Sequence, residues 1–141
     1  MNFKHLDSID PSTCINGKMN RINRLTGNIF RRHLKDFDVT SSQLTLLFVL
    51  YKRGGLTQKE LTDILFMEKS SVNRNLRRLF ENGYATKKSF PIIEITDDGK
   101  MLLEKVVPSW QAAMKEIRES LQQDGESAVD TILSKLKTTH S

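Results

Sequence analysis

The chain has 141 residues, a length that suits one domain with a core of its own and argues against a second independent domain. Its 22 basic and 17 acidic residues give a formal net charge of +5, which favours an anionic partner but excludes a polycationic tail. The single cysteine, Cys14, excludes an internal disulfide framework, and the histidines lie too far apart for a local metal motif. No catalytic constellation or phosphate loop is present, so no catalytic residue, metal site or cofactor is predicted.

The N-terminal sequence MNFKHLDSID is polar and acidic, whereas a signal peptide begins basic and continues apolar. The longest apolar run, around Leu44 to Tyr51, is far too short to cross a bilayer. We therefore expect a soluble, cytoplasmic protein with no membrane partner. Residues 1 to about 13 are expected to form a loose leader ending at Asp10-Pro11, where Asp can cap a helix and Pro can occupy its first turn.

A first long helix is expected from Ile15 to Leu34, because its apolar residues keep near-helical spacing. The other faces of this helix carry many basic side chains and no acid before Asp36. These basic residues are Lys18, Arg21, Arg24, Arg31, Arg32 and Lys35. This stripe is either a phosphate-facing surface or ordinary solvated surface, and the sequence leaves both readings open.

A second helix is expected to begin at Thr40, which is spaced from Gln43 as a capping box. It is apolar on most sides from Leu44 to Tyr51, so it is predicted to be the core helix. Arg53-Gly54-Gly55 then supplies a glycine stop and a turn.

Residues Leu56 to Gly83 predict two short helices with a tight turn between them, a helix-turn-helix. Thr57 and Glu60 form a second capping box at the start of the first helix. The second helix has a buried stripe at helical spacing, formed by Val72, Leu76, Leu79 and Phe80. Its outward side carries Ser70, Ser71, Asn73, Arg74, Arg77 and Arg78.

The outward residues are the types that read DNA. Arginine binds guanine or phosphate, asparagine binds adenine, and serine binds either. This chemistry is typical of a recognition helix. The alternative is an ordinary solvated helix face.

After Gly83 the apolar period changes from helical to two. Tyr84 to Lys88 and Ile92 to Thr96 are predicted to be short strands, with a hairpin turn at Ser89-Phe90-Pro91. A hairpin directly behind a recognition helix is a wing.

Thr96 is expected to cap a long helix that runs to about Gln123. Beyond Asp124-Gly125 a last helix is expected, with apolar positions from Val129 to Leu136. These two helices are too long and too apolar to be satisfied within a domain of this size. The surplus predicts a homodimer.

The order of these elements, together with the residues themselves, resembles the MarR family of transcriptional regulators. The resemblance spans roughly residues 15 to 137. Its closest segments are VTSSQLTLLFVL, GGLTQKELTDIL, EKSSVNRNLRRLFENGY and ITDDGKMLLEKV. It implies a mainly α fold with a small β-hairpin wing, in which residues 14–36 and 97–138 supply the dimerisation helices and residues 39–96 form the winged helix-turn-helix lobe.

The same resemblance implies which residues contact double-stranded DNA. The family's positions at the start of the recognition helix fall on Ser70, Ser71, Asn73 and Arg74, with Arg77 one turn further on. The wing departs from the family, because it is shorter and lacks the Asp-x-Arg signature whose arginine enters the minor groove. Lys87 and Lys88 are therefore expected to contact phosphates only. The turn also departs, since Phe66 stands where a small residue is frequent.

Family members commonly act as repressors that a small, often aromatic, ligand releases from DNA. By this resemblance a pocket is expected, lined by Phe30, His33, Leu34, Phe48 and Trp110, and the alternative for each residue is plain core or interface packing. The sequence thus predicts a dimeric, DNA-binding transcriptional regulator, a ligand-responsive repressor at an inverted-repeat operator. The competing interpretation is a winged-helix protein-interaction module whose basic face engages an acidic protein.

Overall fold

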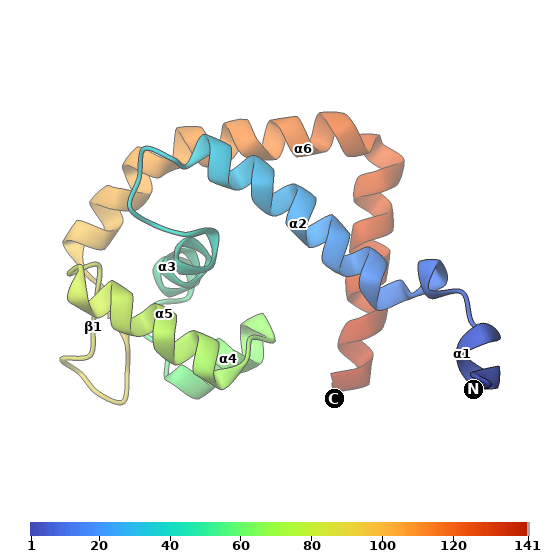
Figure 1. Ribbon diagram of the computed structural model, residues 1–141. Coiled ribbons are helices and arrows are strands. Elements are labelled where there is room, and N and C mark those ends of the chain that lie inside the picture. The colour runs from blue at the N-terminus through green and yellow to red at the C-terminus, as the bar shows by residue number, and fades with distance from the viewer. Residues whose placement is uncertain (141) are drawn as a thin grey trace.

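The computed structural model describes residues 1–140, which form a series of helices and one two-stranded hairpin (Figure 1). The helices are α1 (Lys4–Asp7), α2 (Ile15–His33), α3 (Ser41–Arg53), α4 (Gln58–Leu65), α5 (Lys69–Glu81) and α6 (Asp97–Lys137). The strands are β1 (Ala85–Thr86) and β2 (Glu94–Ile95), and short 3-10 helices lie at Pro11–Thr13 and Thr138–His140. We call residues 39–96 the lobe, and α2 together with α6 the arch. The mainly α fold class is confirmed.

The N-terminal leader is less irregular than expected, because it contains α1 and a 3-10 helix. Asp10 does act as a cap, but of the 3-10 helix, where its Oδ1 accepts a hydrogen bond from the backbone N–H of Ser12 at 3.0 Å. The long helix α2 begins later, at Ile15, and is capped by Cys14, whose Sγ accepts a hydrogen bond from the N–H of Gly17 at 3.4 Å. All side chains from residue 1 to residue 13 are exposed.

The core of the lobe surrounds α3. Leu44, Leu46, Leu47 and Leu50 of this helix are almost fully buried. They pack with the buried side chains of α4 and α5 and with the first part of α6, namely Leu61, Val72, Leu76, Leu79, Leu103 and Val106. Both predicted capping boxes are present, so α3 and α4 begin where the sequence indicated.

The wing is an antiparallel pair in which Ala85 faces Ile95 and Thr86 faces Glu94. Its strands are shorter than predicted, and the loop between them spans residues 87–93. A bridge between Leu56 and Ile93 attaches this loop to the start of α4. Gly99, in the first turn of α6, packs so closely beneath the hairpin that a Cβ there would collide with the carbonyl oxygen of Tyr84.

The arch is formed by α2 and α6, which pack against each other above the lobe (Figure 1). α6 turns sharply at Gln122, whose backbone leaves the helical region at φ 59° and ψ −175°. The predicted break at Asp124-Gly125 is therefore wrong by two or three residues, and both lie in the second arm of α6. Arg118 and Glu126 form an ion pair of 3.1 Å across the bend.

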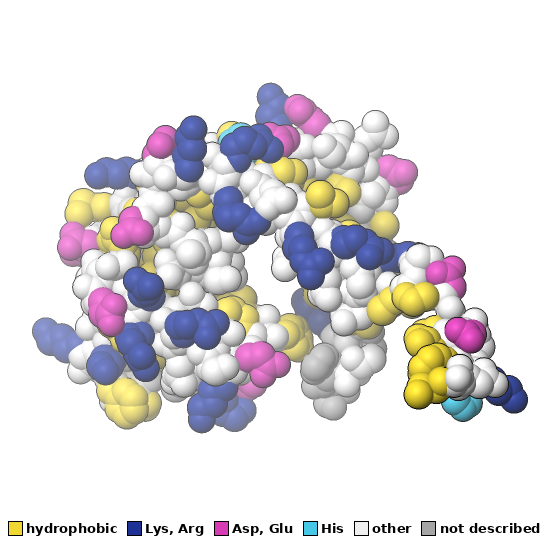
Figure 2. All heavy atoms as spheres, in the orientation of Figure 1, with side chains coloured by type: hydrophobic (Ala, Val, Ile, Leu, Met, Phe, Trp, Pro, Cys, Tyr) yellow, Lys and Arg dark blue, Asp and Glu magenta, His cyan; other side chains and the backbone are white. Residues whose placement is uncertain are grey.

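Many apolar side chains of the arch are exposed. On α2 they are Ile15, Ile22 and Leu25, and on the second arm of α6 they are Val129, Ile132, Leu133 and Leu136. The N-terminal segment adds Phe3, Leu6 and Ile9, and apolar side chains are visible along it in Figure 2. Within the described residues, no helix combines the length and the apolar character needed to span a membrane.

Candidate nucleic-acid interface

The helix-turn-helix is built from α4, α5 and the turn between them. Thr57 caps α4 by accepting from the N–H of Glu60 at 3.1 Å, while the Glu60 carboxylate accepts from the N–H of Thr57 at 3.1 Å. The backbone hydrogen bond from Thr57 lowers the pKa of Glu60. Phe66 ends α4 in the left-handed conformation, at φ 54°, with half of its surface exposed. The geometry of the turn is thus adjusted at Phe66.

α5 presents the predicted contact residues to solvent. Buried Val72, Leu76 and Leu79 fix its inner face. Ser70, Asn73, Arg74, Arg77 and Arg78 are exposed, and Ser71 is half-buried. The guanidinium of Arg74 lies 3.5 Å from Ser71 Oγ, so these two side chains meet at the surface. From Lys69 to Arg78 the helix contains no acidic residue, which leaves its outward face positive.

The wing places Lys87 beside α5. Its ammonium lies 5.5 Å from the centre of the Phe80 ring, in cation–π contact. A hollow of about 240 Å³ separates α5 from the wing, and Asn73, Arg77, Lys87 and Phe90 contribute to its lining. The structure therefore brings predicted contact residues of α5 and of the wing together around this hollow. Lys88 is exposed and does not line the hollow.

Three neighbouring residues were missed by the sequence reasoning. Gln58, Lys59 and Lys69 line a second hollow of about 440 Å³ where α4 and α5 begin. Lys59 is paired with Asp63 at 2.9 Å, and this hydrogen bond raises the pKa of Lys59. Basic side chains gather over α4, α5 and the wing in Figure 2. In the sequence, the one indication of these three residues was that Lys59 and Lys69 lie near the predicted starts of helices.

The residues expected to line a ligand pocket lie between the arch and the lobe, but they line different spaces. Phe48 and Trp110 touch, with ring centres 5.6 Å apart and planes tilted by 57°. Phe30 is half-buried and Leu34 is buried. Leu34, Phe48 and Trp110 each line a separate cavity.

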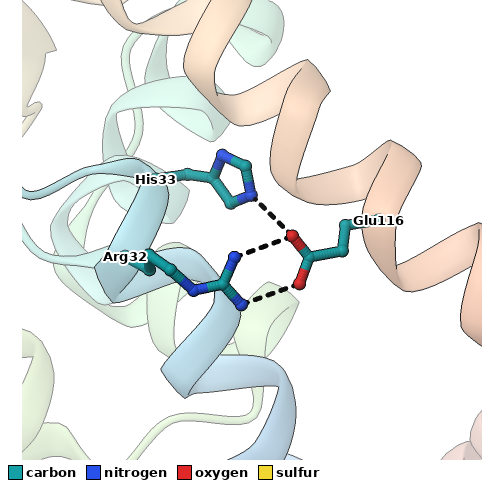
Figure 3. A network of polar contacts seen from close by, with 3 residues as sticks. All are labelled: Arg32, His33 and Glu116. Carbon is teal, nitrogen blue, oxygen red and sulfur yellow. Dashed lines mark hydrogen bonds and ion pairs between the residues drawn. The ribbon is translucent and has the colours of Figure 1, made fainter.

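The fifth predicted residue, His33, belongs to a polar cluster that joins α2 to α6 (Figure 3). Arg32 donates two hydrogen bonds to the Glu116 carboxylate, at 2.8 and 2.7 Å, and His33 Nε2 lies 3.0 Å from the same group. The bonds from Arg32, and then that from His33, lower the pKa of Glu116 to about 2. This partner could not be predicted from local spacing, because residues 33 and 116 meet only in the folded chain.

The largest of the described cavities lies between α2 and the start of α3. It measures about 530 Å³ and has no acidic residue in its lining. Its basic members are Arg24, Arg31 and Lys35, and its apolar floor is formed by Leu34, Phe37 and Val39. Part of the basic stripe on α2 therefore faces a cavity. The sequence had left open only a phosphate-facing surface or an ordinary solvated surface for this stripe.

These elements define a winged helix-turn-helix protein with a long helical arch. A family model described as "MarR family" matches residues 37–91, which include α3, α4, α5 and most of the wing. Together with the relatives described next, this match shows that the lobe of the chain is similar to the MarR family.

One sequence relative and two solved structures illustrate the similarity. An HTH-type transcriptional regulator of Bacillus cereus is 29% identical over 91 residues, and the alignment covers 62% of this chain and 62% of the relative. BpsR of Bordetella bronchiseptica, whose DNA binding is regulated by 6-hydroxynicotinic acid, matches with a TM-score of 0.82 at 18% identity, covering 92% of this chain and 98% of BpsR. A mutant MarR of E. coli complexed with operator DNA matches with a TM-score of 0.74 at 19% identity, covering 86% and 92%.

Proposed function

We propose that the chain is a dimeric transcriptional regulator that binds a specific site in double-stranded DNA. The observation that carries this proposal is the outward face of α5, which is basic, has no acidic residue from Lys69 to Arg78, and is exposed beside a wing that carries two lysines. With 13 residues, α5 is about 20 Å long and suits the major groove. Similarity to a MarR structure that contains operator DNA supports the same conclusion.

Within this proposal, the residues of α5 divide into two roles. Ser70, Ser71, Asn73 and Arg74 stand on the first half of the helix, where recognition helices contact base edges. Arg77 lies on α5 beside the wing, Lys87 and Lys88 lie in the wing loop, and these three residues are proposed to bind phosphates. Base contacts give specificity, and phosphate contacts give affinity and register.

Dimerisation is supported by the exposed apolar side chains of the arch. A stripe of Val129, Ile132, Leu133 and Leu136 on the second arm of α6 has no cover within the described residues. A second copy of the chain would bury it against the same arms of the partner. Because such a dimer presents two copies of α5 related by a two-fold axis, its operator is an inverted repeat with half-site centres about 10 base pairs apart, or a multiple of that spacing.

We further propose that a small aromatic ligand controls DNA binding, and that the protein acts as a repressor. The proposed ligand residues are Phe30, His33, Leu34, Phe48 and Trp110. Of these, the rings of Phe48 and Trp110 already meet between arch and lobe, while Leu34 lines a different cavity. The cavity beside Leu34 holds three cations that suit the carboxylate of such a ligand. The regulation of BpsR by an aromatic acid supports this part of the proposal.

Selection from a random DNA library tests the DNA-binding proposal. The purified protein should enrich duplexes with an inverted repeat, and their affinity should fall by orders of magnitude between ~50 and ~200 mM salt. Failure to enrich any duplex at ~50 mM salt would contradict DNA binding. That result would favour the alternative, in which the basic face binds an acidic protein.

A further inference from the structure

We propose that Phe90, at the tip of the wing, is an apolar wedge that enters the minor groove of the operator. This inference rests on the proposed DNA binding and adds a contact that neither the wing lysines nor α5 provide. Phe90 is 78% exposed, although a large aromatic ring normally finds a partner surface. Figure 2 shows an apolar group at the wing tip with basic side chains close by.

Backbone hydrogen bonds of the wing loop keep the Phe90 ring exposed to solvent. The N–H of Phe90 donates to the carbonyl of Lys87 at 3.0 Å, and the N–H of Ile92 donates to the carbonyl of Ser89 at 3.0 Å. Buried Ile93 then anchors the loop to the start of α4 through its bridge with Leu56. Two successive turns therefore fix the loop in a shape that presents Phe90 to solvent.

The position of the wing relative to α5 points to the minor groove. With α5 in the major groove, the sugar–phosphate strand at the groove edge must cross between α5 and the wing. The hollow of about 240 Å³ lies there, with Arg77 on one wall and Lys87 on the other, so both cations can hold that strand. Phe90 lines the wing side of this hollow. A DNA strand held there would therefore bring the adjacent minor groove to the Phe90 ring.

The uncharged aromatic ring of Phe90 determines which DNA sequences the wing would favour. An arginine in this place would favour the negative potential of a narrow A-tract groove. An uncharged ring instead inserts partly between base pairs, as apolar wedges of minor-groove proteins do, and this costs least at flexible pyrimidine–purine steps. The operator is therefore expected to carry a TA or CA step where each wing touches it.

A substitution series separates the wedge from ordinary phosphate contacts. The probe is a fluorescent duplex that carries the selected inverted repeat, titrated at several salt concentrations. F90A should bind ~10-fold more weakly than wild type with an unchanged salt slope, and F90L should retain most of the affinity. The control K88A should instead flatten the salt slope by about one unit. Because Phe90 is exposed, circular dichroism should show all variants folded.

A spectroscopic readout locates the contact. 2-Aminopurine placed at successive positions outside each half-site should brighten at one step on binding of wild type, because unstacking relieves its quenching, and should stay dark with F90A. Wild-type affinity for F90A, or no brightening at any position, would overturn the wedge while leaving DNA binding intact. Absence of salt-dependent binding by wild type would overturn the proposed function itself, so the two failures are distinguishable.

Discussion

The lobe buries its apolar side chains within one chain, whereas the arch leaves many of its apolar side chains exposed. In the lobe, α3 buries Leu44, Leu46, Leu47 and Leu50 against elements of the same chain. In the arch, the second arm of α6 leaves Val129, Ile132, Leu133 and Leu136 exposed. A residue of the lobe therefore contributes to the stability of one chain, whereas an apolar residue of the second arm contributes only when a partner covers it. The predictions below test this difference.

The largest effect is expected from Leu46→Ala in the lobe. Leu46 is fully buried, so its truncation leaves a cavity and should lower the free energy of unfolding by about 2–5 kcal/mol. Urea unfolding followed by circular dichroism measures this. Thr45→Ala, at the exposed neighbouring position, is the matched control and should cost far less. A loss below ~1 kcal/mol for Leu46→Ala would show that α3 is not the centre of the core.

The second effect concerns the arch. Leu133→Asp places a charge in the exposed stripe and should raise the dissociation constant of the proposed dimer about 100-fold. Sedimentation of the 16.2 kDa chain should shift from dimer toward monomer. Thr131→Asp, which lies on the opposite side of the same helical arm, should leave the dimer intact. Equal behaviour of the two variants would show that the stripe is not the interface.

The third effect separates two roles within the lobe. Arg74→Ala should weaken specific binding by ~1–3 kcal/mol and relax the preference at one base position, if Arg74 makes a bidentate base contact. Binding is measured by anisotropy on the selected duplex and on its single-base variants. Lys87→Ala is the comparison, and it should weaken binding to all sequences about equally. Equal, sequence-independent losses would mean that Arg74 contacts phosphate.

The sequence predicted the parts of this fold that depend on local spacing. Both capping boxes are contacts between residues three apart, so Thr40 with Gln43 and Thr57 with Glu60 were readable before folding. The buried stripe of α5 follows from helical period in the same way. These local rules explain why the lobe was predicted more closely than the arch.

The bend in α6 illustrates what local rules could not predict. Glycine often ends a helix, and this placed the expected break at Asp124-Gly125. In the structure Gly125 instead lies against Leu121, so close that a Cβ there would come within 2.9 Å of the leucine Cβ. The glycine allows close packing across the bend, and Gln122 makes the bend itself.

The candidate site shows the same limit. The exposed residues of α5 follow from the period of one helix, and their exposure was predicted. The hollows between α5 and α4 and between α5 and the wing depend on how these three elements pack. Likewise, the exposure of Phe90 depends on turns that the sequence indicated only as a hairpin.

The smallest effect is expected at the joint between α2 and the first arm of α6. The pKa of Glu116 is about 2, below its ordinary value of 4.5, chiefly because Arg32 donates to its carboxylate. A carboxyl whose pKa is lowered by folding stabilises the fold above its unfolded pKa, and this contribution is lost as pH falls through the folded value. Glu116→Gln should therefore lower the melting temperature at pH 7, and the difference from wild type should shrink between pH 4.5 and about 2. Glu119→Gln on the same helix is the control, since Glu119 makes an exposed ion pair of 3.9 Å with Lys115. A difference for Glu116→Gln that stays undiminished to pH 2 would show that shape, and not charge, holds the arch at this point.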